Sequence, residues 1–213
     1  YIEGSLADVA IEYRLKADKT GSQADFELAA RKFQEYIDTF PISDDFYQQQ
    51  WYLADTLYKA RKVAEAKEEY QSLYKTRDHH PYGDGALFQL MRCLEQVIIN
   101  EHGPIDRLPP KAQVERTYTT PAGEISVYAL SEAHAQFIEI ADQILSYPFA
   151  SPTEEGVPDY AAVVEKNRSA LMYLPAQILY YHQRFDEARE RFKAIIDLLP
   201  HKDEAAYAAG LLV

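Results

Sequence analysis

Residues 26–41 read FELAARKFQEYIDTFP, and residues 185–200 read FDEARERFKAIIDLLP. Aligned without a gap, the two stretches share phenylalanine, alanine, phenylalanine, isoleucine and proline at equivalent positions. The small residue, the aromatic residue four positions later and the next apolar residue fall on one face of a helix. The proline beyond them cannot continue the helix, because it has no backbone N–H to donate. The repetition therefore predicts a helical unit that occurs more than once.

Related stretches lie between these two. Residues 63–74, VAEAKEEYQSLY, place Ala66 and Tyr70 at the positions of the alanine and aromatic residue of 26–41, 37 residues later. A helix precedes this stretch in QQQWYLADTLYKAR, residues 48–61, and its apolar positions recur in LFQLMRCL, residues 87–94. A fixed period of this size indicates stacked units, each made of two helices.

This pattern resembles the tetratricopeptide repeat, a helix–turn–helix unit with the pattern W-x2-L-G-x2-Y…A-x3-F…P. The resemblance implies an all-α superhelix of about four repeats and a terminal helix. The tryptophan and glycine of the first helix are replaced, and Pro175 stands where leucine is expected, which predicts a kink. We expect one array over 1–213, with repeats at 4–41, 44–78, 82–148 and 159–200, and the start of another at 203–213.

Two segments interrupt the period, residues 100–123 inside the third repeat and residues 147–159 before the fourth. Both are rich in proline, which predicts loops. ERTYTT lies near the end of the first segment, and EISVY directly follows that segment. The two stretches flank a Pro-Ala-Gly turn and can pair as a hairpin. Either segment is a tolerated surface insertion or a binding loop, because long loops in compact domains often carry function.

Composition excludes several classes of function. The net charge of −12 argues against non-specific nucleic-acid binding, because phosphates would be repelled. No run of 18 apolar residues is present, so no membrane span is predicted. Cys93 is the single cysteine and is expected to be a small buried residue. We expect the chain to be a piece of a longer protein, since it begins without methionine and ends within a helical pattern.

Motifs for catalysis or metal binding are not found in the sequence. It has no P-loop, G-x-G-x-x-G, H-E-x-x-H, G-x-S-x-G or C-x-x-C. DHHPYGD, residues 78–84, is the best candidate metal cluster, but turn chemistry explains it more simply, with Asp84 as a helix cap. His134, His182 and His201 are predicted to be isolated, at the surface or with satisfied hydrogen bonds. We therefore expect no enzyme activity, no cofactor and no metal.

The resemblance implies that a partner binds the concave wall formed by the first helices. Aromatic and arginine side chains on this wall are typical of interface hot spots. The alternative is that Trp51 and Phe88 pack against the neighbouring repeat. By the register of the family, the partner-binding residues are predicted to be Arg14, Trp51, Asp55, Tyr58, Phe88, Arg92, Tyr173, Gln177 and Tyr180.

The resulting hypothesis is a non-catalytic scaffold that binds a peptide or helix of a protein partner. The phrasing of the repeats resembles bacterial cell-envelope members of the family, including proteins of outer-membrane assembly, the Tol system and surface motility. This implies a periplasmic or outer-membrane-associated location, with a cytoplasmic location as the alternative. Two other hypotheses are a regulatory or targeting domain of a larger protein that carries an enzyme, and an enzyme centred on DHHPYGD.

Overall fold

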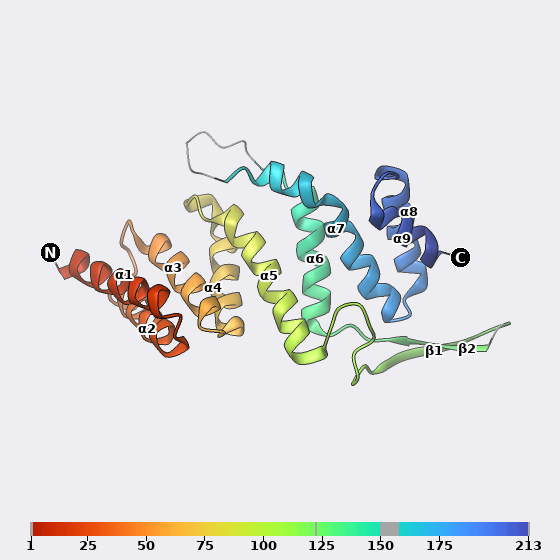
Figure 1. Ribbon diagram of the computed structural model, residues 1–213, viewed down its shortest axis with the longest axis horizontal. Helices are drawn as coiled ribbons and strands as arrows, with labels where there is room; N and C mark the ends of the chain where they lie inside the picture. Colours follow the sequence, from red (N-terminus) through yellow and green to blue (C-terminus); the bar gives the residue numbers. More distant parts are fainter. Residues whose placement is uncertain (1, 122, 150–157, 213) are drawn as a thin grey trace. The chain divides into compact units, whose positions relative to one another are not determined.

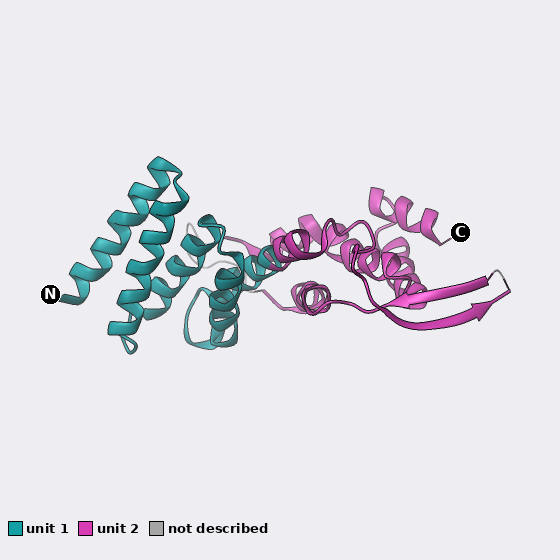
Figure 2. Ribbon diagram, turned by 90° about the horizontal axis from the view of Figure 1, so that it is seen from below, with its two compact units in different colours: residues 1–93 teal, residues 94–213 magenta. Residues whose placement is uncertain are grey.

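The computed structural model describes residues 2–121, 123–149 and 158–212, and within them helices follow one another in antiparallel pairs (Figure 1). The chain divides into two compact units, residues 1–93 and residues 94–213 (Figure 2). The all-α fold of helix–turn–helix pairs, tetratricopeptide-like in its element order, is confirmed, including the inserted hairpin. A single continuous array over the whole chain stays a prediction.

The first unit holds the first two predicted repeats. From the first helix of this unit to the fourth, each helix packs on the next one along the chain, as expected for stacked helical hairpins. Its helices are α1 (Ile2–Thr20), α2 (Gln23–Thr39), α3 (Phe46–Lys59), α4 (Val63–Lys75) and the amino-terminal part of α5 (Gly83–His102), with a short 3-10 turn at Arg77–His79 between α4 and α5. The core is the predicted stripe of small and aromatic residues, and Ala29, Phe33, Ala66 and Tyr70 are all buried.

The second unit holds the hairpin and the later helices. These are β1 (Val114–Thr120), β2 (Gly123–Tyr128), α6 (Glu132–Ser146), α7 (Tyr160–Tyr181), α8 (Phe185–Leu198) and α9 (Asp203–Leu211). The strands are antiparallel, with Tyr118 opposite Ile125. Phe192 and Ile195 of α8 are buried against α7 and α9. Helix α7 continues through Pro175, which is buried. Of the predicted loop at 147–159, residues 150–157 lie outside the described residues.

The turns inside three of the helical hairpins share one backbone feature. Gly21 between α1 and α2 has φ +63°, Arg61 between α3 and α4 has φ +61°, and Gln183 between α7 and α8 has φ +56°. A left-handed residue just after a helix satisfies its last carbonyls and reverses the chain. Glycine adopts this conformation without strain, whereas arginine and glutamine do so at a cost. The repeat therefore preserves the backbone shape of the turn and not its residue type.

Two clefts also occupy equivalent positions in different repeats. One is lined by Leu57 of α3 with Glu65 and other residues of α2 and α4. The other is lined by Leu179 of α7 with Glu187 and other residues of α6 and α8. Leu57 and Leu179, like Glu65 and Glu187, are 122 positions apart, so both clefts follow the same register. This agreement shows that the doubled sequence builds the same local geometry in each unit.

Candidate functional site

The predicted partner-binding residues of the first unit make side-chain contacts from one first helix to the next. Arg14 of α1 forms an ion pair with Asp55 of α3. The Arg14 guanidinium carbon also lies 5.2 Å from the centre of the Tyr52 ring. One step along the array, the Arg92 guanidinium carbon of α5 lies 5.1 Å from the ring centre of Tyr58 on α3. The register predicted from sequence therefore brings α1, α3 and α5 together on one face of this unit.

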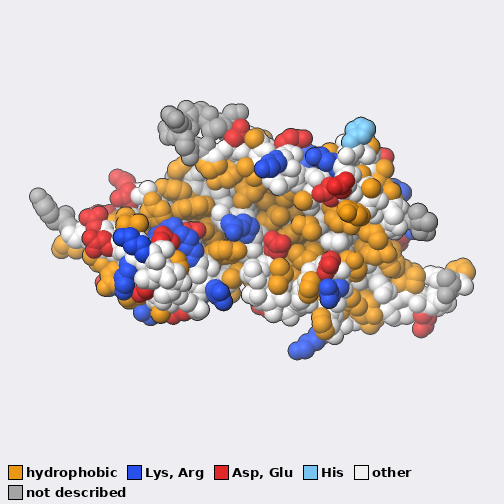
Figure 3. Space-filling view, viewed as in Figure 1, with side chains coloured by type: hydrophobic (Ala, Val, Ile, Leu, Met, Phe, Trp, Pro, Cys, Tyr) orange, Lys and Arg blue, Asp and Glu red, His pale blue; other side chains and the backbone are white. Residues whose placement is uncertain are grey.

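Further charges extend this face. Lys59 Nζ of α3 lies 2.9 Å from Asp18 Oδ1 of α1 and 3.6 Å from Asp55 Oδ2. Arg14 Nε lies 3.8 Å from Asp18 Oδ2, so two cations and two carboxylates form one network. Exposed ion pairs each contribute little to stability, about 0–1 kcal/mol. On the face drawn in Figure 3, charged side chains gather over α1 and α3, whereas apolar side chains gather along α7.

Trp51 packs inside the array. Its ring centre is 5.4 Å from that of buried Tyr70 on α4 and 5.9 Å from that of Tyr82, which precedes α5. The ring is therefore held between its own repeat and the next one, and it is half-buried. Phe88 is also half-buried. This placement matches the alternative that Trp51 packs against the neighbouring repeat, and its binding role stays a prediction.

In the second unit, the predicted residues Tyr173, Gln177 and Tyr180 all lie half-buried on α7. Tyr173 has its ring centre 5.9 Å from that of Phe192 on α8 and 6.4 Å from that of Tyr207 on α9. Tyr180 is 5.4 Å from Phe185 by the same measure. Both tyrosines therefore contribute to the helix packing as well as to the surface.

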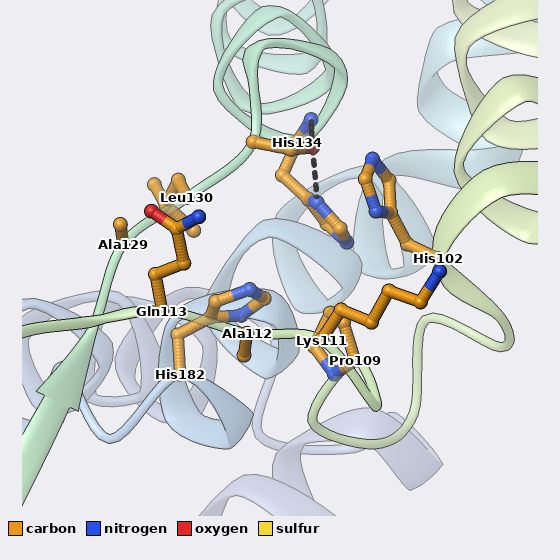
Figure 4. A pocket seen from close by; sticks show the side chains of 10 residues that line it. His102, Pro109, Lys111, Ala112, Gln113, Ala129, Leu130, His134 and His182 are labelled. Carbon is orange, nitrogen blue, oxygen red and sulfur yellow. Dashed lines mark hydrogen bonds between the residues drawn. The ribbon is translucent and has the colours of Figure 1, made fainter.

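The prediction that the histidines are isolated is wrong for His134 and His182, although both make the expected hydrogen bonds. His134 and His182 are buried and lie together with His102, while His201 is exposed on a turn (Figure 4). The ring centre of His134 is 5.2 Å from that of His102 and 4.9 Å from that of His182. Sequence reasoning treated each histidine alone because they are far apart in the chain. His102, His134 and His182 all stand at helix ends, and this shared position is the sequence signal that could have grouped them.

The three histidines line a pocket of about 240 Å³ at the base of the hairpin. His102 is the last residue of α5, His134 lies in the first turn of α6 and His182 directly follows α7. The segments that enter and leave the hairpin complete the wall with Lys111, Gln113 and Leu130, among others (Figure 4). The hairpin is tied to this place by the Tyr128 N–H, which donates to the His182 carbonyl at 2.9 Å.

Burial lowers the histidine pKa values in this pocket. Desolvation is the main cause for His134, whose pKa falls from 6.5 to about 4, with the neighbouring His182 and His102 adding to the effect. Desolvation also lowers the pKa of His182, although the hydrogen bond to the Ile178 carbonyl favours its charged form. Both rings are therefore neutral at pH 7. Burial likewise raises the pKa of the Cys93 thiol to about 12, so this buried cysteine is unreactive.

The DHHPYGD segment is explained by local hydrogen bonds. His80 Nδ1 accepts from the Tyr82 N–H at 3.1 Å, and His80 Nε2 lies 3.1 Å from Thr76 Oγ1. Asp78 and His79 are exposed. Helix α5 begins at Gly83, so its cap position is Tyr82, and the predicted cap Asp84 lies two residues later, in the first turn. Across residues 2–121, 123–149 and 158–212, no group of three or more His, Cys, Asp or Glu residues is placed to hold a metal ion.

No helix in the described part of the chain is both long and apolar enough to cross a membrane.

Comparison with known proteins identifies similar folds only. No protein-family model matches the chain, and no curated protein sequence matches it. A structure titled "MamA RS-1 ArsTM double mutant" is 10 % identical with a TM-score of 0.48, covering 97 % of this chain and 90 % of that one. A second, "MamA 41-end from Desulfovibrio magneticus RS-1", is 11 % identical with a TM-score of 0.43, covering 95 % and 90 %. Such distant likenesses transfer no function to this chain.

Proposed function

We propose that this protein is a non-catalytic scaffold that binds an extended or helical segment of a partner protein on its first helices. The observation that carries the proposal is the contact series across α1, α3 and α5. Arg14 and Asp55 form one link of this series, and Tyr58 and Arg92 form the next. A half-buried surface of arginine, aspartate and tyrosine can offer both charge-assisted hydrogen bonds and flat apolar area to a ligand.

The arrangement suits a segment that runs across several helices. Its side chains would meet a repeating set of aromatic and charged groups, one set for each repeat. Stacked helical pairs provide extended binding surfaces of this kind because each repeat adds the same face again. In the second unit, α7 presents the corresponding positions through Tyr173, Gln177 and Tyr180. These residues are the first-helix positions of the fourth repeat, and they form a separate candidate surface within the second unit.

We further propose that the partner belongs to a multiprotein complex of the bacterial cell envelope, in the periplasm or at the outer membrane. The support for this location is the resemblance in repeat phrasing described above. Outer-membrane assembly, Tol-type complexes and surface motility machinery are the classes that the resemblance suggests. Fractionation of cells that express the full-length protein tests the location directly, and recovery in the cytoplasmic fraction alone would reject it.

The decisive experiment compares two pairs of substitutions. The test variant Tyr58→Ala/Arg92→Ala removes the stacked pair between α3 and α5. The control variant Tyr74→Ala/Arg77→Ala removes a pair of the same kind after α4, where the guanidinium carbon lies 4.8 Å from the ring centre. Both change the same residue types and the same charge. Trp51 is left intact because its contact with Tyr70 contributes to the core.

Each variant is used as bait in a lysate of the source organism, and circular dichroism verifies that the helices are retained. We expect the parent and the control to capture the same proteins and the test variant to lose them. A loss of about 2 kcal/mol in binding, typical of one interface hot spot, corresponds to roughly a thirtyfold weaker complex. If the test variant captures what the parent captures, the first-helix face is not the binding site.

A further inference from the structure

The pocket lined by the three histidines differs chemically from the rest of the chain. Its polar lining residues are histidine, lysine, glutamine and serine, and among residues 2–121, 123–149 and 158–212 no aspartate or glutamate lines it. This is notable in a chain whose net charge is −12. Its volume of about 240 Å³ exceeds the roughly 30 Å³ that one water molecule occupies. We propose that this pocket binds a small oxyanion, a carboxylate or a phosphate, and takes up a proton with it.

The hydrogen bonds already present assign the ring protons. Ser131 Oγ accepts from the His134 N–H at 3.3 Å and lies 2.7 Å from His134 Nδ1. When the serine hydroxyl donates to Nδ1, the proton of neutral His134 lies on Nε2. His182 Nδ1 must carry a proton, because it lies 2.8 Å from the Ile178 carbonyl, which can only accept. Neutral His182 therefore has a bare Nε2.

Both Nε2 atoms are free to meet a ligand. His134 and His182 are each 2 % exposed, and in the described part of the chain no hydrogen bond to either Nε2 is found. Figure 4 shows the three rings clustered around one space with Lys111 beside them. In the neutral pocket, His134 Nε2 is a donor and His182 Nε2 is an acceptor. A proton added to His182 turns both atoms into donors, which is the arrangement that an oxyanion requires.

The helix ends around the pocket favour the same state. Ser131 and His134 belong to the amino-terminal end of α6, a helix of 15 residues, where the backbone carries a partial positive charge that attracts anions. His182 stands at the carboxyl-terminal end of α7, where the partial negative charge favours protonated imidazole. The backbone thus supports an anion and an imidazolium side by side.

The surrounding charges are accounted for as well. Lys111 is a lining cation. Arg184 acts on His182 from its own turn, but its Nη1 lies 2.5 Å from Glu115 Oε2 and its Nε lies 2.8 Å from Glu187 Oε1. The Glu101 carboxylate is 3.8 Å from His102 Nε2 and does not line the pocket. An anion inside the pocket would therefore be the direct counter-charge for a second proton on His182 or His134.

Binding is then linked to pH. Without a ligand, burial keeps the rings neutral, and a bound anion reverses this by stabilising the charged form. If binding takes up one proton, the affinity for the anion rises as the pH is lowered. The rise is up to about tenfold for each pH unit, from pH 7 down to the pKa that the histidine ring has without a ligand. This linkage distinguishes the site from a surface lysine cluster, whose affinity for anions would not depend on histidine protonation.

The test uses inorganic phosphate and acetate as separate probes with the full chain. Isothermal titration calorimetry at about pH 5.5, repeated in buffers of different ionisation enthalpy, measures both affinity and protons taken up. The variant His182→Asn keeps a donor for the Ile178 carbonyl and removes Nε2. The matched control His80→Asn removes another hydrogen-bonded histidine, which lies in the first unit outside the pocket.

We expect saturable binding with proton uptake, weakened at least tenfold by His182→Asn and unchanged by His80→Asn. Binding of phosphate alone or of acetate alone supports the site and identifies the ligand chemistry. Nuclear magnetic resonance of the wild-type histidine rings gives a second readout if His182→Asn fails to fold, since His134 and His182 should shift with the probe. Absence of saturable binding by both probes, or equal weakening by both variants, would overturn the proposal.

Discussion

Removal of His134 tests the physics of the pocket most directly, through the dependence of stability on pH. Burial moves the pKa of this ring from 6.5 to about 4. Between these two values the unfolded chain binds a proton that the folded chain does not, so the free energy of unfolding falls as the pH is lowered. One proton is worth about 1.4 kcal/mol for each pH unit, which gives a loss of about 3 kcal/mol between pH 7 and pH 4.

The perturbation is His134→Asn, which keeps an acceptor near the Ser131 hydroxyl but cannot titrate. At pH 7 the variant should be less stable than the parent, because it leaves part of the ring volume empty. As the pH falls through the range from about 6.5 to about 4, the parent should lose this advantage. The difference between parent and variant should therefore shrink by about 3 kcal/mol. Carboxylates titrate in both proteins, so their contribution cancels in the difference.

The assay is urea unfolding, followed by circular dichroism, at several pH values between about 7 and 4. Cationic buffers with chloride keep phosphate and carboxylates away from the pocket. His201→Asn is the control, because its exposed side chain meets water in the folded and unfolded chain alike. Hydrogen exchange of α6 and α7 locates the effect within the second unit. A parent and variant whose stabilities fall in parallel with pH would refute the argument that His134 is held neutral by burial.

Three further predictions concern packing, an ion pair and a turn. Phe33→Ala and Phe192→Ala should each lower the free energy of unfolding by about 3–5 kcal/mol, because both rings are buried. Hydrogen exchange should show lost protection within the unit that carries the change. Arg191→Lys should lower the free energy of unfolding by about 1 kcal/mol, because Arg191 contacts both oxygens of Asp142 at 2.8 and 2.6 Å and lysine cannot form this paired contact. An unchanged urea midpoint would contradict this prediction. Arg61→Gly should raise the free energy of unfolding by about 1 kcal/mol, because glycine adopts the left-handed backbone of this turn without strain. A lower melting temperature would contradict this prediction.

Periodicity in the amino-acid sequence was enough to predict the repeating helical pairs. Alanine, an aromatic residue and an apolar residue at helical spacing define a buried stripe, and a stripe of this kind needs only local periodicity to be recognised. The residues of α2, α4 and α8 that this spacing selects are buried as predicted. The prolines after α2 and α8 mark their ends for an equally local reason. The hairpin was also predictable, because its turn residues lie between two strand-like stretches.

The predicted binding face was determined only in part by the sequence. Register was enough to place Arg14, Asp55, Tyr58 and Arg92 on the first helices of successive repeats. The structure then pairs Arg14 with Asp55 and Tyr58 with Arg92. Register could not decide how deeply Trp51 is held between Tyr70 and Tyr82. Depth of packing depends on the shapes of side chains from several helices at once, and helical spacing contains no information about these shapes.

The histidine pocket was decided by tertiary structure alone. His102, His134 and His182 are distant in sequence and belong to no shared motif. They meet because the last residue of α5, the first turn of α6 and the turn after α7 all line the pocket at the base of the inserted hairpin. Removal of water at this meeting point is what lowers the pKa values of His134 and His182. Burial is a property of the assembled fold, so only the packed chain turns three ordinary histidines into a pocket that responds to protons.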